Sequence, residues 1–162
     1  MYLENRLGAL TEPYVAMAVG IPGSGKTTLA NRLSDGLGIV RVCPDDIRKE
    51  LTGSALNQTV HEEVWEIAND RIAEAIGNGK SVILDATNTI PWRRHEAIKK
   101  YRQFGAPIVA GIVVATPLEV AKQRNLHRSE QVPEHVIERM HWDLIKHPVT
   151  RKDGFDVLLG YK

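Results

Sequence analysis

GIPGSGKTT, residues 20–28, is the stretch that decides the fold of this chain. An apolar run, YVAMAV at 14–19, leads into it, and a helical pattern, LANRL at 29–33, follows it. The spacing Gly20, four residues, then Gly25-Lys26-Thr27 matches the phosphate-binding loop at every fixed position. The alternative, a chance glycine-rich turn, is disfavoured because the expected strand and helix flank the loop.

The loop predicts a site for a nucleoside triphosphate. Glycines let the backbone curl until several amide N–H groups point into one concave nest, and a helix beginning near Lys26 adds the positive end of its dipole. Lys26 would reach the β- and γ-phosphates as a point charge, and the Thr27 hydroxyl would ligate the Mg²⁺ that bridges them. We therefore expect ATP to contact the loop residues Gly23, Ser24, Gly25, Lys26, Thr27 and Thr28.

Length and composition predict a single domain, residues 1–162. The chain has a mass of 18.1 kDa and is 43% hydrophobic, enough for one well-covered core. The one cysteine, Cys43, excludes an internal disulfide. We expect a soluble, cytoplasmic protein, because the chain shows neither a secretory signal nor the roughly 18 consecutive apolar residues of a membrane span. A net charge of +1 argues against coating long nucleic acids by charge alone, although a few arginines suffice to grip one end of a strand.

Short β-branched runs alternate with helical patterns along the chain. This predicts an α/β fold with a central parallel sheet and helices on both faces. Together with the phosphate loop and the family resemblance given below, it is expected to be a P-loop kinase fold with a helical lid. Residues 1–13 are expected to form an N-terminal arm or short helix. After the loop, strands are predicted at 39–42, 81–85 and 108–115 with an edge strand at 155–159, and helices at 57–77, 91–104, 116–128 and 133–147.

The segment CPDDIRKEL, residues 43–51, carries the candidate acceptor chemistry. Ligands of parallel α/β sheets bind at the carboxyl ends of the strands, so Asp45 and Arg48 should lie on the same edge as the phosphate loop. Asp45 could accept a proton from an attacking hydroxyl, and Arg48, on the same helix face, could hold an anionic group of the acceptor. The alternative is that Asp45 only caps the helix as its N-cap. Asp46 is interpreted as a first-turn charge favoured by the helix dipole.

Asp85 ends the apolar run SVILD at 81–85. A carboxylate at the end of a buried strand is unfavourable unless it has a partner or a task, and in a phosphate-loop protein that task is Mg²⁺ binding or fixing the Thr27 hydroxyl. Asn88, in the next loop, either orients the substrate or caps the following helix, and the cap is favoured. Arg93 and Arg94 lie on a basic helix face that is either solvated or contacts a nucleic acid strand.

His61-Glu62 has the form of the opening of a metalloprotease motif. The second histidine that this motif requires is missing, because residue 65 is Trp. We therefore expect His61 at the surface and Trp65 in the core or in the wall of a cleft.

Arg124 and Arg128 precede a short polar segment, SEQV at 129–132, between the last two predicted helices. Four residues apart, they would share one helix face. In nucleotide kinases a mobile lid at this place brings arginines over the phosphates. We expect such a lid at about 124–133, with a solvent-facing basic helix end as the alternative.

The blocks GIPGSGKTT, PDDIRKEL, VILDATN followed by RR, RNLHR and VPEHVIERM, taken in order, resemble the 5′-hydroxyl polynucleotide kinases of the bacteriophage and bacterial RNA-repair type. The resemblance extends from about residue 15 to residue 142. Kinase domains of this family often sit beside a phosphatase or ligase domain, for which 162 residues leave no room, so the expectation is restricted to the kinase step. The resemblance implies the following roles: Lys26 and Thr27 as loop lysine and hydroxyl, Asp45 as general base, Arg48 as the arginine that grips the acceptor's phosphate, Asp85 as the strand-end aspartate, and Arg124 and Arg128 as lid arginines.

The expected function is therefore transfer of the γ-phosphate of ATP, with Mg²⁺, to a 5′-hydroxyl end of DNA or RNA. A kinase for a small hydroxylated metabolite or sugar nucleotide, similar to zeta-type toxins, uses the same scaffold and is the first alternative. A non-catalytic ATP-binding module is the second, but Asp45 would then lack a role. No membrane and no obligate protein partner is expected.

Overall fold

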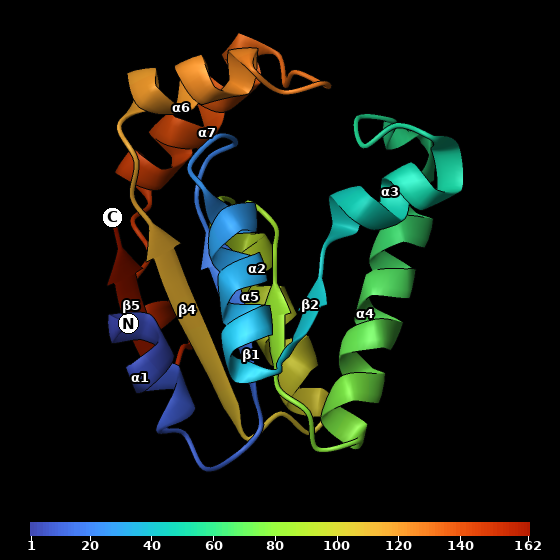
Figure 1. Ribbon diagram of the computed structural model, residues 1–162, viewed down its shortest axis with the longest axis vertical. Coiled ribbons are helices and arrows are strands. Elements are labelled where there is room, and N and C mark those ends of the chain that lie inside the picture. The colour runs from blue at the N-terminus through green and yellow to red at the C-terminus, as the bar shows by residue number, and fades with distance from the viewer.

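Five parallel strands form the centre of the computed structural model, which describes residues 1–162 (Figure 1). Their order in the sheet is β2-β3-β1-β4-β5, and every neighbouring pair is parallel. The strands are β1 Tyr14–Val19, β2 Val40–Val42, β3 Val82–Leu84, β4 Ile108–Val114 and β5 Val157–Tyr161. Because all strands run the same way, their carboxyl ends meet at one edge, as the sequence predicted.

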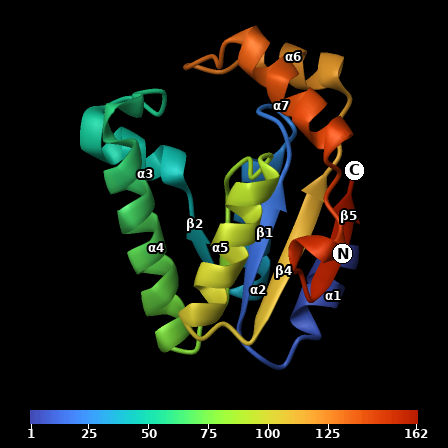
Figure 2. The same cartoon turned by 180° about the vertical axis from the view of Figure 1, so that it is seen from behind.

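Helices cover both faces of this sheet (Figures 1 and 2). The α-helices are α1 Tyr2–Gly8, α2 Lys26–Leu37, α3 Pro44–Thr52, α4 His61–Gly77, α5 Pro91–Gln103, α6 Leu118–Leu126 and α7 Glu134–Lys146, and two 3₁₀ turns lie at Gln58–Val60 (η1) and Arg151–Asp153 (η2). The helices α1 and α2 lie on one face, and α4 and α5 lie on the other. None of them is both long and apolar enough to cross a membrane.

The central strand β1 separates two hydrophobic cores. All six of its residues are buried. Val15 and Met17 belong to the core under α4 and α5, and Ala16 and Ala18 belong to the core under α2. Successive side chains of a strand point to opposite faces, so an unbroken apolar run is what a strand covered on both sides requires.

The helices α6 and α7 form a separate layer above the carboxyl edge of the sheet (Figure 1). A small cluster of Ile21, Ala121 and Ile137 joins this layer to the phosphate loop. The layer therefore rests on the loop itself, with the connecting residues 127–133 between the two helices.

Several helix ends differ from the sequence prediction. Asp45 is not the N-cap of α3, because the helix begins at Pro44 with Cys43 as its N-cap. Asn88 is not the N-cap of α5 either, since Ile90 holds that position. In both helices a proline takes the first helical position, where its fixed φ angle favours the start of a helix and moves the cap to the preceding residue.

Candidate active site

The phosphate loop joins β1 to α2 and closes tightly because of two glycines. Gly23 and Gly25 have φ angles of +81° and +99°, which residues with a Cβ rarely adopt. A Cβ on Gly23 would lie 2.3 Å from the Ala121 carbonyl oxygen, so the loop packs directly against α6. Gly25 is the N-cap of α2, and the first backbone amides of that helix therefore face the site where a phosphate would lie.

Lys26 is buried in the loop. Its Nζ atom donates hydrogen bonds to the Ile21 carbonyl oxygen at 2.7 Å and to Ser24 Oγ at 3.4 Å. Burial lowers the pKa of Lys26 to about 8, although the nearby charge of Asp85 acts in the opposite direction, and the charge of Arg128 lowers this pKa further. Lys26 thus lies among charges supplied by the end of β3 and by the segment after α6.

A cleft of about 460 Å³ opens at the carboxyl edge of the sheet, beside the loop. Nine of the residues predicted from the sequence line it: Gly23, Gly25, Lys26, Thr27, Thr28, Asp45, Asp85, Arg124 and Arg128. The structure therefore brings together groups spread over more than one hundred residues. Three predicted residues lie outside the cleft lining, namely Ser24, Arg48 and Asn88.

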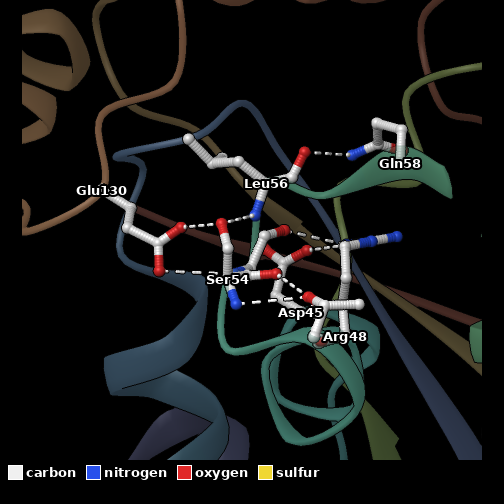
Figure 3. Close-up of polar contacts among 8 residues, drawn as sticks. Asp45, Arg48, Ser54, Leu56, Gln58 and Glu130 are labelled. Carbon is white, nitrogen blue, oxygen red and sulfur yellow. Dashed lines mark hydrogen bonds and ion pairs between the residues drawn. The ribbon is translucent and has the colours of Figure 1, made fainter. Parts of the chain in front are cut away.

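Asp45 and Arg48 form an ion pair on the first turns of α3 (Figure 3). Arg48 Nη1 lies 2.6 Å from Asp45 Oδ1 and also donates a hydrogen bond to the Ala55 carbonyl oxygen at 3.2 Å. The Arg48 side chain is only 5% exposed, whereas the Asp45 side chain is 57% exposed. Asp45 therefore lines the cleft, whereas its partner Arg48 is buried beside it, outside the cleft lining.

Arg41, on β2, is a residue that the sequence interpretation missed. Its guanidinium bridges two carboxylates, with Nη2 at 2.6 Å from Asp85 Oδ2 and Nη1 at 2.6 Å from Asp46 Oδ2. One sequence feature could have revealed its role, namely a single arginine inside the apolar run IVRV. Arg41 provides the buried Asp85 with a partner. Asp46 is predicted as a first-turn charge of the helix, and in the structure it also pairs with Arg41.

Arg124 and Arg128 are exposed, and neither forms an ion pair with a carboxylate. Arg124, in the last turn of α6, directs Nη1 toward the carbonyl oxygens of Gly23 and Ser24, at 3.4 Å from each. Arg128 lies beyond the end of α6, so the two arginines do not share a helix face as predicted. Both nevertheless line the cleft beside the loop.

Asn88 holds the loop after β3 against the central strand. Its φ angle is +49°, and its Nδ2 atom donates to the carbonyl oxygens of Ala18 at 2.7 Å and Ala86 at 3.4 Å. The Gly20 amide donates to the Thr87 carbonyl oxygen nearby. The side-chain amide of Asn88 is therefore used to fix this loop to the end of β1.

Arg94 does not lie on a basic surface as predicted. It is 1% exposed and donates to the backbone oxygens of Asn88 and Thr89 at 3.0 Å each. Its guanidinium also pairs with Asp153 at 3.2 Å. A buried arginine is satisfied in this way by partners that lie far apart in the sequence, which no local pattern reveals. Arg93 is exposed, as expected.

A second group that the sequence did not reveal joins the two sides of the cleft. Glu130, in the segment between α6 and α7, accepts hydrogen bonds from Ser54 Oγ at 2.6 Å and from the Ala55 amide at 3.3 Å (Figure 3). The Ser54 hydrogen bond is the main reason why the pKa of Glu130 lies below its usual range. We call this contact between Glu130 and residues 54–55 the latch.

Residues 15–144 of the chain match the family AAA_33, which is described as an AAA domain. The chain belongs to this family. The match covers the phosphate loop, the Asp45–Arg48 pair, the end of β3 and both Arg124 and Arg128, so the AAA_33 domain contains the whole candidate site. The fold is that of a P-loop kinase, as the sequence motifs predicted.

Among curated proteins, the L-seryl-tRNA(Sec) kinase of Methanococcus maripaludis is 25% identical over 87% of this chain. The chain spans 61% of the length of that relative. The tRNA kinase is thus a distant and longer relative.

Among solved structures, a chain from the Pnkp1/Rnl/Hen1 RNA repair complex superposes with a TM-score of 0.76 and 25% identity, covering 93% of this chain and 49% of that one. A fungal RNA kinase (TM-score 0.66, 94% of this chain and 39% of that one) and shikimate kinase from Acinetobacter baumannii (TM-score 0.55, 94% and 85%) are each 18% identical. The last two similarities show the fold alone.

Proposed function

We propose that this protein transfers the γ-phosphate of ATP to the 5′-hydroxyl end of a DNA or RNA strand. One observation carries the proposal: the Asp45 carboxylate, positioned by the buried Arg48, shares a cleft with Lys26 and with two arginines that have no carboxylate partner. The similarity to a chain of an RNA repair complex and to an L-seryl-tRNA(Sec) kinase supports an acceptor that contains nucleic acid.

In the proposed reaction the acceptor hydroxyl oxygen attacks the γ-phosphorus in line with the bond that breaks. The new bond joins that oxygen to phosphorus, the bond between the γ-phosphorus and the β,γ-bridging oxygen breaks, and ADP leaves. Asp45 accepts the hydroxyl proton. Lys26, Arg124 and Arg128 stabilise the charge that spreads over the transferring group.

The phosphate loop and the end of β3 also fit a magnesium ion bound together with ATP. Arg41 binds only Oδ2 of Asp85, so Oδ1 of that carboxylate has no hydrogen-bond partner, and the Thr27 side chain lines the same cleft. The described residues contain no group of three or more His, Cys, Asp or Glu that could hold a metal by themselves. This agrees with Mg²⁺, which usually takes one or two protein oxygens and completes its shell with phosphates and water. When bound, the ion would neutralise charge on the β- and γ-phosphates.

The decisive assay uses labelled ATP with a 5′-hydroxyl oligonucleotide, a panel of nucleosides, sugars and polyols, and a reaction without acceptor. We expect label on the oligonucleotide 5′ end, and a loss of about 10²–10⁴-fold in kcat for Asp45→Asn with ATP affinity nearly unchanged. Asp70→Asn, an exposed carboxylate on α4 outside the cleft, is the matched control. Label on a small molecule but on no oligonucleotide would overturn the proposal.

A kinase for a small hydroxylated metabolite is the second candidate, and the latch favours it. Glu130 and residues 54–55 meet across the cleft, and a volume of about 460 Å³ lies in the lower part of the range for small-ligand sites. Ionic strength separates the two candidates. The affinity for a strand with several phosphates should fall steeply as salt rises, whereas the affinity for a neutral metabolite should not.

A further inference from the structure

A second cavity, of about 310 Å³, lies between α4 and α5 on one face of the sheet. We call it the α4–α5 groove. Ala86 and Thr87 line both this groove and the candidate active-site cleft, so the groove begins where the cleft ends. The hydrogen bonds of Thr87 and Asn88 to the first residues of the phosphate loop and to β1 fix the wall between the two cavities.

The groove combines aromatic rings with positive charge. Trp65 of α4 is half-buried, and Trp92, at the start of α5, is 63% exposed. The Arg93 guanidinium lies 5.3 Å from the centre of the Trp92 ring, and Lys100 lies two turns further along α5. Glu96 is the one acidic residue in the lining. An indole ring beside guanidinium and ammonium groups matches a nucleobase joined to a phosphodiester, because bases stack on aromatic rings whatever their sequence.

His61 is a groove residue that lies within the electrostatic influence of both Arg48 and Arg93. It is half-buried in the groove lining, and its Nδ1 atom is shielded and has no hydrogen-bond partner. Burial lowers the pKa of His61, and the nearby charges of Arg48 and Arg93 lower it further. The charges of Arg48, which pairs with Asp45, and of Arg93, which lines the groove, therefore both act on this imidazole.

We infer that the α4–α5 groove binds the nucleotides that follow the 5′-terminal one in an unpaired acceptor strand. Trp65 and Trp92 stack with the bases, and Arg93 and Lys100 contact the phosphodiesters. This inference rests on the proposed function, since it places the acceptor hydroxyl at Asp45. It also goes beyond that function, because it predicts a preference for unpaired ends longer than one nucleotide.

The first test measures KM for 5′-hydroxyl oligouridylates of one, two, four and eight nucleotides at constant ionic strength. One stacked base should lower KM by about 5-fold to 100-fold between the mononucleotide and the tetranucleotide. Trp92→Ala should weaken this length dependence several-fold, because one of the two stacking rings is lost. Trp142→Ala, which changes a 55% exposed tryptophan on α7 outside the groove, is the matched control and should keep it. An unchanged length dependence in Trp92→Ala, or an equal loss in Trp142→Ala, would overturn the inference.

Charge is tested with two neighbouring lysines of α5. Lys100 lines the groove, while Lys99 is exposed and does not. Lys100→Gln should raise KM for the tetranucleotide several-fold and reduce its salt dependence, because one phosphate contact is lost. Lys99→Gln should behave like the unchanged protein, and equal effects of the two substitutions would contradict the inference.

Fluorescence provides a readout that does not depend on turnover. In the double variant Trp65→Phe, Trp142→Phe, Trp92 is the sole tryptophan, and its emission should be quenched by octauridylate and not by uridine or inorganic phosphate. Quenching without phosphorylation of any oligonucleotide would reject the proposed function and retain the groove as a binding site. Phosphorylation of an oligonucleotide without quenching and without length dependence would support the proposed function and overturn the inference about the groove. Quenching by uridine alone would show a site for one nucleoside and would overturn the inference for a strand.

Discussion

At the scale of single residues, the site depends on charges held in unusual surroundings. Lys26 is buried inside the loop that it serves, Asp85 is buried against Arg41, and Asp45 lines the cleft beside the buried Arg48. Each of these groups was expected from the sequence except Arg41. Its role depends on two carboxylates that come from different segments, so it becomes visible only when β2 and β3 pair.

Removing the Lys26 charge should stabilise the ligand-free fold below pH 8. Burial lowers the pKa of Lys26 from about 10.5 to about 8, so the folded state binds the proton less tightly than the unfolded chain does. Stability from this group therefore rises with pH between about 8 and 10.5, and the charged form costs up to about 3 kcal/mol at pH 7. Lys26→Met removes that cost but also loses the hydrogen bond to Ile21, worth about 1 kcal/mol.

We expect Lys26→Met to raise the free energy of unfolding by about 1–2 kcal/mol at pH 7 and to abolish the gain in Tm on adding ATP. Urea denaturation of both proteins at pH 7, 8, 9 and 10 measures the difference, which should shrink as pH rises. Lys99→Met, at an exposed position, is the control. A difference that stays constant over this pH range would show that Lys26 is not destabilised by burial.

At the scale of elements, short connections after the strands carry the chemistry and helices hold them in place. The segment after β2 becomes α3 with Asp45, and the segment after β3 forms the wall between cleft and groove. The latch connects two segments that each follow a helix, the loop after α3 and the segment 127–133 that carries Arg128.

Breaking the latch should slow the reaction without preventing ATP binding. Glu130→Gln and Ser54→Ala each remove the charge-assisted hydrogen bond, and because the pair is partly solvated we expect kcat to fall by up to about 5-fold. The double variant should have the same kcat as either single variant, since both substitutions act on the same contact. Hydrogen exchange should become faster at residues 53–57 and 127–133 together. Additive kinetic losses, or faster exchange in only one segment, would contradict a shared contact.

At the scale of the whole molecule, one buried arginine joins segments that are distant in the chain. Arg94 of α5 contacts the backbone of residues 88–89 and the Asp153 carboxylate near the C-terminus. It therefore connects the wall of the candidate active site to the segment that leads into the edge strand β5.

Arg94→Ala should destabilise the fold by about 3–5 kcal/mol, because it removes the buried guanidinium that pairs with Asp153 and satisfies the carbonyl oxygens of Asn88 and Thr89. Equilibrium urea unfolding at pH 7 measures the loss. Arg102→Ala, an exposed arginine on the same helix, should cost less than about 1 kcal/mol. Similar losses for the two variants would show that the Arg94 network contributes little.

The sequence by itself determined the order of strands and helices, the phosphate loop and the edge at which the site forms. These follow from local properties: glycines at fixed spacing, apolar runs long enough for buried strands, and the rule that parallel strands end at one edge. The parallel five-stranded sheet and its helical layers were therefore predictable, as were nine of the residues that line the cleft.

Only the tertiary structure decided which charges meet. Three contacts join residues that are 44, 59 and 76 positions apart in the sequence: Arg41 with Asp85, Arg94 with Asp153, and Glu130 with Ser54. The tertiary structure also decided that Arg48 lies buried beside Asp45 and that a groove lined by Trp65 and Trp92 opens next to the cleft. The physical reason is that a buried charge is stabilised by whichever opposite charge the packing of distant elements places beside it, and sequence spacing does not encode that distance.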